Sequence, residues 1–237
     1  MLTAVAALKN VLQRCMSCAK RGHRTAILFT GGLDSTVLAA LSVHQKPVLV
    51  FGAILDQDCR AYNARSILYS RRIASLLGLA YQTVGISQRD YSDGIKGMLA
   101  AGVCSKDRDF PAAAFILESL RGQGIGVVVS GMGSNELFSS CKKTTSTFSK
   151  LQASYDEHRL LGRAERIIFR APFLEESVMK VVRGLVCSGY ERSEVMSALL
   201  ADYPDVSQLM KERVSGHSVV PKRFLPVRGI VGSEKGV

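Results

Sequence analysis

Residues 27–36 read Ile-Leu-Phe-Thr-Gly-Gly-Leu-Asp-Ser-Thr, an apolar run that breaks at two glycines and resumes with helical spacing. This pattern predicts a short buried strand over 26–29 and a helix over 33–41. Gly31 and Gly32 permit a tight turn and the close approach of a ligand. The turn leaves unpaired N–H groups at the positive end of the helix dipole, where an anion binds. The stretch therefore predicts a strand, a phosphate-binding turn and a helix in succession.

Hydroxyl and carboxylate side chains surround these glycines. Thr30, Ser35 and Thr36 add hydrogen-bond donors, which makes a polyphosphate the natural ligand. Asp34 would repel phosphate unless a divalent cation lay between them, and Mg²⁺ binds in this mixed carboxylate and phosphate manner. The alternative is an ordinary strand-turn-helix with two glycines. The hydroxyls on either side and the enclosed aspartate favour the phosphate site.

The turn is neither a Walker P-loop nor a dinucleotide fingerprint, because no Gly-Lys-Ser/Thr follows and its glycines are adjacent. It resembles the PP-loop of the N-type ATP pyrophosphatases, Ser-Gly-Gly-x-Asp-Ser, with Thr30 in place of the first serine. The resemblance implies ATP as ligand and a fold of the adenine nucleotide α-hydrolase-like type. The nucleotide-binding residues that we expect here are Phe29, Thr30, Gly31, Gly32, Leu33, Asp34, Ser35 and Thr36.

Length and composition indicate a globular, basic chain. With 237 residues and 47% apolar content, the chain fits one α/β domain. It has no apolar run of 18 residues and no basic segment before an apolar one at its start, so we expect a cytoplasmic protein without membrane contact. Six scattered cysteines indicate a reducing compartment, and we interpret the Cys15/Cys18 pair as buried thiols rather than a zinc site.

Periodicity along the chain predicts alternating strands and helices. A continuous apolar run at 48–55 and the segments at 79–86 and 126–130 predict further strands, with helices at 2–20, 60–78 and 112–120. Such alternation implies a doubly wound parallel sheet. Residues 87–111 are polar and glycine-rich, which predicts a loop with a short helix at 95–101. Helical spacing at 151–161, 175–186, 192–200 and 206–214 predicts a C-terminal helical extension.

We therefore expect a single domain over 1–237. It comprises an N-terminal helix within 1–24, a nucleotide-binding α/β core over 25–150 and the helical extension over 151–237.

A second strand-turn-helix pattern occurs at residues 127–138, Val-Val-Val-Ser-Gly-Met-Gly-Ser-Asn-Glu-Leu-Phe. In open α/β sheets ligands bind at the carboxyl ends of strands where the connections diverge, so two such turns on neighbouring strands would face one site. The alternative is a glycine-softened helix start capped by Ser134 or Asn135. The pairing with the first turn favours a binding site.

The second turn and later segments resemble the asparagine synthetase family. Residues 130–138 are similar to the family's S/T-G-x-G-[SA]-D-E-L-F pattern, and residues 171–175 to its R-x-P-F-L-[DE]. Residues 161–166 and 221–223 are similar to the N-L-G-R-D-D-R and L-P-K-R motifs of a subgroup, the asparagine synthetase domain-containing proteins. The motifs follow the family's order over most of the chain.

This resemblance implies an ATP-dependent, AMP-forming amide ligase. A carboxylate, aspartate by resemblance, would attack the α-phosphorus of ATP, and ammonia would then convert the acyl-adenylate to an amide. The catalytic candidates are Asp34, Glu136 and Lys222, with Lys222 neutralising charge on the α-phosphate, and the Mg²⁺ candidates are Asp34 and Asn135. The further nucleotide-binding candidates are Val50, Phe51, Ser130, Gly131, Gly133 and Ser134.

Three positions depart from the family pattern. Met132 and Asn135 stand where asparagine synthetases usually carry Glu and Asp, which predicts nucleotide binding with weak or no asparagine synthesis. Leu2 stands where the glutaminase domain would supply an N-terminal cysteine, so ammonia would be free or come from a glutaminase partner.

Two other classes of function remain open. One is a degenerate nucleotide-binding regulatory protein, for which the net charge of +11 could serve contact with RNA or a ribosome, although no nucleic-acid motif supports this. The other is a tRNA-modifying PP-loop ligase. That reading would require catalytic cysteines near the site or an appended RNA-binding module, and the sequence indicates neither.

Overall fold

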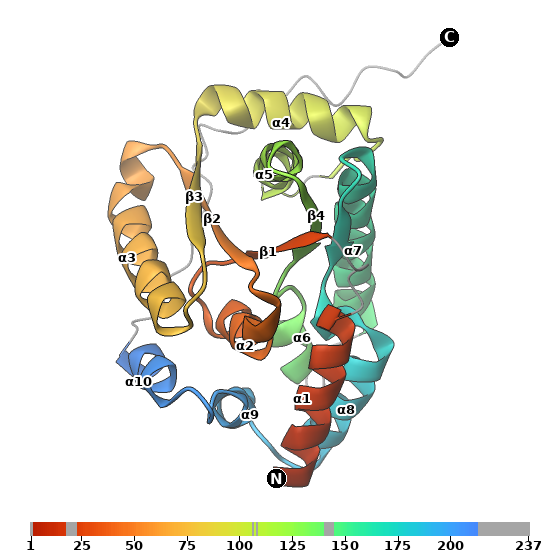
Figure 1. Cartoon of the computed structure of the whole chain (residues 1–237). Coiled ribbons are helices and arrows are strands. Elements are labelled where there is room, and N and C mark those ends of the chain that lie inside the picture. Colours follow the sequence, from red (N-terminus) through yellow and green to blue (C-terminus); the bar gives the residue numbers. More distant parts are fainter. Residues whose placement is uncertain (1, 18–22, 106, 108, 140–144, 213–237) are drawn as a thin grey trace.

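The computed structural model describes residues 2–17, 23–105, 107, 109–139 and 145–212. Five strands form one sheet in the order β3-β2-β1-β4-β5, and every neighbouring pair is parallel (Figure 1). The doubly wound parallel sheet is therefore confirmed. The strands are β1 (Arg24–Leu28), β2 (Val48–Ile54), β3 (Tyr81–Ile86), β4 (Ile125–Val129) and β5 (Ile168–Arg170).

The sheet separates two apolar cores. Ile27 and Val127 belong to the first core, whereas Ala26 and Val128 belong to the second, because successive side chains of a strand point to opposite faces. Both faces are covered, which explains why β2 and β4 are continuous apolar runs.

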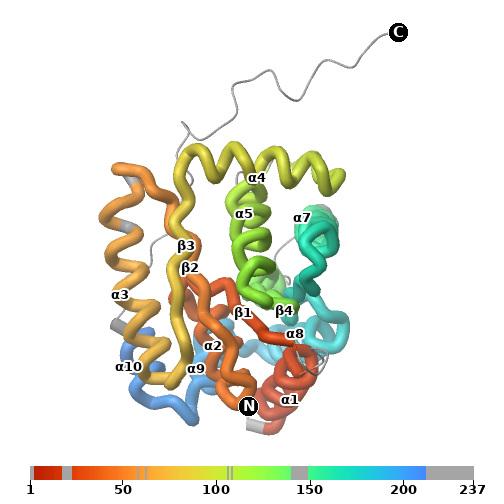
Figure 2. The backbone as a smooth tube through the Cα atoms, turned by 45° about the horizontal axis from the view of Figure 1, so that its top comes forward, coloured from red at the N-terminus to blue at the C-terminus, as the bar shows by residue number. Residues whose placement is uncertain are grey.

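Helices from different parts of the chain cover the two faces. The first core receives α1 (Leu2–Ser17), α2 (Leu33–Leu41), α3 (Arg60–Leu76), α8 (Glu176–Cys187), α9 (Arg192–Leu199) and α10 (Pro204–Glu212). The second receives α4 (Gln88–Ala100), α5 (Asp109–Gly122) and α7 (Thr145–Ala164). Figures 1 and 2 show α4 running across α5 on one side of the sheet. No described helix is long and apolar enough to cross a membrane.

The prediction of a loop over 87–111 is wrong, because α4 fills half of it. A capping box starts this helix: the Asp90 N–H donates to Ser87 Oγ at 3.2 Å, and the Ser87 N–H donates to Asp90 Oδ2 at 2.9 Å. Gly94 lies against the backbone of Pro111, where an added Cβ would come within 2.0 Å of the carbonyl oxygen. This glycine therefore permits the close packing of α4 on α5 and does not break the helix.

Over residues 151–212, where the structure describes it, the C-terminal part is helical as predicted, apart from one strand. Residues 168–170 form β5, which pairs with β4 at the edge of the sheet. This strand is not predictable from the sequence, because three residues are too few to show a periodicity. The helix α7 also spans residue 150, and the division of the chain at that point stays a prediction. Short 3-10 helices occupy Val43–Gln45, Gln57–Cys59 and Pro172–Leu174.

Candidate nucleotide site

The two glycine turns lie at the point where the sheet's connections diverge. β1 and β4 are neighbours, but β1 leads through α2 to β2 on one side, whereas β4 is followed by β5 on the other. Ligands of open α/β sheets bind at the carboxyl edge at such a point. The first turn (residues 29–32) follows β1 and the second turn (residues 130–133) follows β4, so both lie at this edge.

Local hydrogen bonds shape the first turn. Gly31 has a φ of 65°, which favours glycine. The Gly32 N–H donates to Thr30 Oγ1 at 3.3 Å, and the Gly32 carbonyl accepts from Ser35 Oγ at 3.1 Å and from the Thr36 N–H at 3.0 Å. The first N–H groups of α2 have no carbonyl one turn earlier within the helix, so they can donate to a ligand.

The second turn is fixed to β5 and to the segment after it. The Ser130 N–H donates to the Arg170 carbonyl at 2.8 Å, and the Met132 N–H donates to Ser130 Oγ at 3.3 Å. Gly133 has a φ of 92°, and an added Cβ would lie 2.4 Å from Leu174 Cδ2. Backbone conformation and packing thus both require glycine at 133. The short helix α6 (Ser134–Phe138) follows.

The two turns touch each other. A Cβ built on Gly131 would lie 3.0 Å from the Asp34 Cβ and 3.2 Å from the Ser35 backbone nitrogen. The second turn therefore packs directly on the start of α2, and a side chain at 131 would push the turns apart. The two glycine turns are therefore neighbours in the structure, as expected from the sequence.

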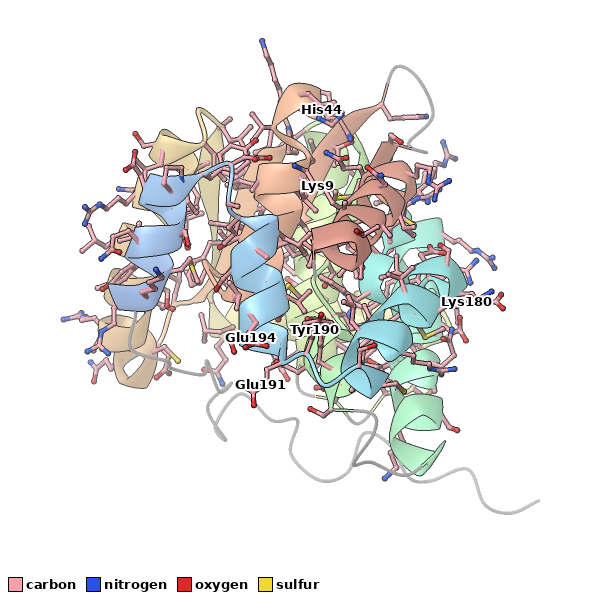
Figure 3. The ribbon with its side chains drawn as sticks, turned by 90° about the horizontal axis from the view of Figure 1, so that it is seen from below. Lys9, His44, Lys180, Tyr190, Glu191 and Glu194 are labelled. Carbon is pink, nitrogen blue, oxygen red and sulfur yellow. The ribbon has the colours of Figure 1, made fainter. Side chains whose placement is uncertain are left out.

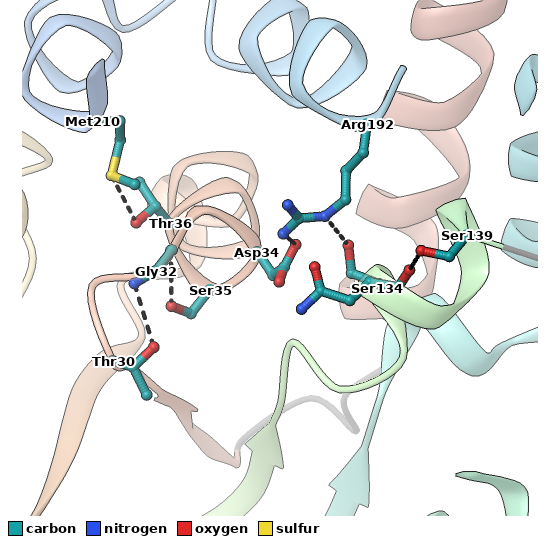
Figure 4. Close-up of polar contacts among 10 residues, drawn as sticks. Thr30, Gly32, Asp34, Ser35, Thr36, Ser134, Ser139, Arg192 and Met210 are labelled. Atoms are coloured by element: carbon teal, nitrogen blue, oxygen red, sulfur yellow. Dashed lines mark hydrogen bonds and ion pairs between the residues drawn. The ribbon is translucent and has the colours of Figure 1, made fainter. Parts of the chain in front are cut away.

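Arg192, at the first position of α9, joins the two helices that follow the turns, α2 and α6 (Figure 4). Its Nη2 donates to Asp34 Oδ1 at 2.5 Å, and its Nε donates to Ser134 Oγ at 3.3 Å. The side chains of Arg192 and Asp34 are 27% and 19% exposed. Arg192 is not among the residues predicted from the sequence. The one sequence feature that points to it is its place at the start of a predicted helix, where the helix dipole disfavours a positive charge.

The donors and acceptors gathered here fit a polyphosphate with a divalent cation. The N–H groups of α2, the buried hydroxyls of Ser35 and Ser134 and the Arg192 guanidinium suit phosphate oxygens. The Asp34 carboxylate suits Mg²⁺. Among the described residues, no group of three or more His, Cys, Asp or Glu side chains could hold a metal. A cation held by Asp34 would thus take further ligands from a nucleotide or water.

The other residues predicted to bind nucleotide are mostly buried. The Thr36 hydroxyl is buried and donates to Met210 Sδ of α10 at 3.7 Å, on the other side of α2 from Arg192 (Figure 4). Phe29, Val50 and Phe51 are buried, and the Val50 carbonyl accepts from the Phe29 N–H at 2.7 Å. Leu33 packs on the first core.

The side chains after the second turn differ in exposure. Met132 is half-buried against the second core, Asn135 is exposed and Glu136 is half-buried. Lys222, the candidate for the α-phosphate, lies outside the described residues.

Two shifted pKa values occur on α7, which packs against β5. Burial raises the pKa of Tyr155 above its ordinary value, although a hydrogen bond with the Ala171 backbone opposes this shift. Burial lowers the pKa of His158, whose ring lies between those of Phe110 and Phe169, with centroids 4.2 Å and 4.9 Å away. These groups belong to the second core, so we assign them to packing and not to the site.

Comparison with known proteins gives a family match and fold neighbours. The asparagine synthase family model matches residues 7–166. The U34-tRNA thiolase NcsA from Methanococcus maripaludis, solved with its [4Fe-4S] cluster, superposes with a TM-score of 0.50 at 14% identity, over 90% of this chain and 79% of that chain. This likeness supports the fold alone. No curated protein matches the chain.

The NMN synthetase from Francisella tularensis gives a TM-score of 0.38 at 12% identity, over 93% of this chain and 98% of that one. A predicted subunit of tRNA methyltransferase from Methanocaldococcus jannaschii gives 0.35 at 13% identity, over 79% and 91%.

Proposed function

The chain belongs to the asparagine synthase family, and we propose that its two glycine turns bind Mg²⁺-ATP and activate a small carboxylate as an acyl-adenylate. The family supports ATP-dependent adenylation as the general type of activity. The observation that carries the proposal is the contact of Gly131 with Asp34 and Ser35, since it joins two turns of phosphate-binding type at the divergence point of the sheet.

The proposed reaction has two steps. A carboxylate oxygen, from aspartate by family resemblance, attacks the α-phosphorus, and the bond from this phosphorus to the bridging oxygen breaks, so pyrophosphate leaves. Ammonia then attacks the acyl carbon, AMP leaves and the nitrogen loses a proton. With aspartate as the carboxylate, the product is asparagine, as in asparagine biosynthesis. The ammonia would be free or supplied by a glutaminase partner. A cytoplasmic protein fits this chemistry.

Residues of the chain would orient the nucleotide for this attack. The N–H groups of α2 and the hydroxyls of Ser35 and Ser134 would fix the β- and γ-phosphates and thereby align the α-phosphorus. Asp34 would hold Mg²⁺, which would supply positive charge to offset the negative charge of the leaving pyrophosphate. Ser130 and Gly131 would contact the base or ribose, with Val50 and Phe51 as a buried wall, and Lys222 would approach the α-phosphate.

The second turn favours one other candidate function, nucleotide binding without efficient amide formation. Met132 cannot accept a proton, and its side chain packs on the second core instead of presenting a polar group. Asn135 is exposed and uncharged, so it is a weaker Mg²⁺ ligand than an aspartate. Such a protein would bind ATP as a regulatory ligand, and its positive charge could serve a contact with RNA or a ribosome.

Release of pyrophosphate separates these functions. The full chain is incubated with Mg²⁺-ATP, a panel of carboxylates including aspartate, and ammonium, with Asp34→Asn as the matched variant. Adenylation predicts pyrophosphate release that depends on one carboxylate and falls about 10²-fold or more in Asp34→Asn. ATP binding without release for any carboxylate would support the regulatory candidate. Absence of both would contradict the site assignment.

A further inference from the structure

We propose that Arg192 is a phosphate-binding residue. Before nucleotide binds, it forms an ion pair with Asp34, and when Mg²⁺-ATP enters, its guanidinium leaves this carboxylate and binds phosphate oxygens. The inference rests on the proposed function and assigns a part in it to a residue outside both glycine turns. Its basis is the bridge from Arg192 to Asp34 in the first turn region and to Ser134 after the second turn.

The packing and capping of α9 fix the backbone position of Arg192. Val195 and Met196 of α9 are fully buried in the first core, which anchors the helix beside α1 and α2. A capping box closes the start of α9, where the Glu191 N–H donates to Glu194 Oε2 at 3.0 Å. Figure 3 shows Glu191 and Glu194 together at this end of the helix. The position of Arg192 therefore follows from the packing of α9.

The described contacts of the Arg192 guanidinium use only some of its N–H donors. It carries five N–H donors, of which its described contacts use one on Nη2 and one on Nε. Arginine forks bind phosphate in a bidentate manner, and the partial exposure of the side chain leaves it accessible. A phosphate beside Asp34 and Ser134 would thus lie within reach of the remaining donors.

The charges around this bridge favour an anion. The N-terminus of α2 and the Arg192 guanidinium both contribute positive charge, and the Asp34 carboxylate opposes them. Arg192 also stands in the first turn of α9, where the helix dipole makes its charge unfavourable. A polyphosphate carries enough negative charge to satisfy both positive groups and a Mg²⁺ ion as well.

Arg192 and Mg²⁺ would compete for the same carboxylate. The guanidinium contacts Asp34 Oδ1 at 2.5 Å, so a cation that approaches this carboxylate meets a positive charge already bound to it. Phosphate would draw the guanidinium away and free the carboxylate. Nucleotide and metal should consequently strengthen each other's binding, because a coupling between two ligands is reciprocal.

The test uses the full chain, its Arg192→Gln and Arg192→Lys variants, and the control Arg159→Gln, which removes another arginine–aspartate ion pair on α7. Calorimetry measures binding of Mg²⁺-ATP and AMP, and electron paramagnetic resonance measures binding of Mn²⁺ with and without ATP. In Arg192→Gln we expect about 10- to 100-fold weaker Mg²⁺-ATP binding, little change for AMP and tighter binding of Mn²⁺ alone. The control should match the parent.

Arg192→Lys keeps the charge but lacks the fork that reaches both partners, so its Mg²⁺-ATP affinity should fall about 3- to 10-fold. This variant decides the matter if Arg192→Gln unfolds. A parent that binds Mg²⁺-ATP, with both variants equal to it in ATP and Mn²⁺ binding, would overturn the inference and leave the proposed function standing. A parent that binds no Mg²⁺-ATP would overturn both.

Discussion

Gly131 lies against Asp34: an added Cβ would be 3.0 Å from the Asp34 Cβ, which is tighter than ordinary van der Waals contact. This contact joins the second glycine turn to the first. It connects two segments about a hundred residues apart into one proposed nucleotide site.

Replacing Gly131 with alanine should therefore harm binding more than folding. The new methyl group would press on Asp34 and on the Ser35 nitrogen at 3.2 Å, which are backbone-linked atoms that cannot rotate away. We expect the Mg²⁺-ATP affinity to fall about 10-fold or more, because the displaced binding groups would no longer match the positions of the phosphates. The matched control is Gly97→Ala in α4, where an added Cβ meets nothing within 4 Å and helix propensity should improve. Equal ATP affinities in the two variants would argue against the joined site.

The free energy of unfolding of a Gly133→Ala variant tests whether the second turn requires glycine for its backbone conformation and its packing. At a φ of 92° the substitution should cost about 1–2 kcal/mol in free energy of unfolding, and the approach to Leu174 should add about 1–3 kcal/mol of overpacking. Gly124→Ala, with a φ of 75° and open space around it, isolates the backbone cost. Chemical denaturation measures both. The packing explanation fails if the two variants lose the same stability.

His158 predicts a pH dependence of stability. Its folded-state pKa lies below the ordinary value of 6.5, chiefly because burial disfavours the charged ring. The unfolded chain then binds more protons, so the contribution of His158 is complete above about pH 6.5 and declines as the pH falls through the lower folded pKa.

The control for this effect is His158→Phe, which keeps a ring between Phe110 and Phe169 but cannot titrate. The pKa of Asp109 is raised, mainly by desolvation, which acts in the opposite direction; this residue is common to both proteins and cancels in their difference. The free energy of unfolding of the parent should fall relative to His158→Phe as the pH drops from 7 to 5. Parallel curves would show that His158 does not titrate with unfolding.

A double variant tests how far the second turn limits catalysis. Met132→Glu with Asn135→Asp restores the family's usual carboxylates, and general acid–base groups contribute about 10²–10⁴-fold in rate. We expect slow or absent asparagine formation in the parent, partial recovery in the double variant and little change in ATP affinity, measured by amino-acid analysis and calorimetry. Asparagine formation by the parent at ordinary rates of about 1–10³ per second would restore the plain synthetase function.

The sequence reveals those parts of the molecule that rest on local pattern. The runs that become β2 and β4 are apolar, and the predicted strands alternate with helical segments, so the parallel sheet and both glycine turns could be predicted. α4 could not, because the glycine at 94 looks like a break until α5 is seen packed against it. The brief strand β5 exists only through its pairing with β4.

Arg192 illustrates the same limit at the site. Its contacts with Asp34 and Ser134 span 158 and 58 residues of sequence, and they arise from the packing of α9 on α1 and α2. No spacing rule along the chain could bring these three side chains together.

Binding of Mg²⁺-ATP to the full chain is the most direct test of the central claim that the two turns form one nucleotide site. With ligand about a hundredfold above its dissociation constant, the free energy of unfolding should rise by about 2.7 kcal/mol, which thermal or chemical denaturation detects. Asp34→Asn should lose the part of this gain that depends on Mg²⁺. An unchanged unfolding transition of the parent in saturating Mg²⁺-ATP would contradict the account.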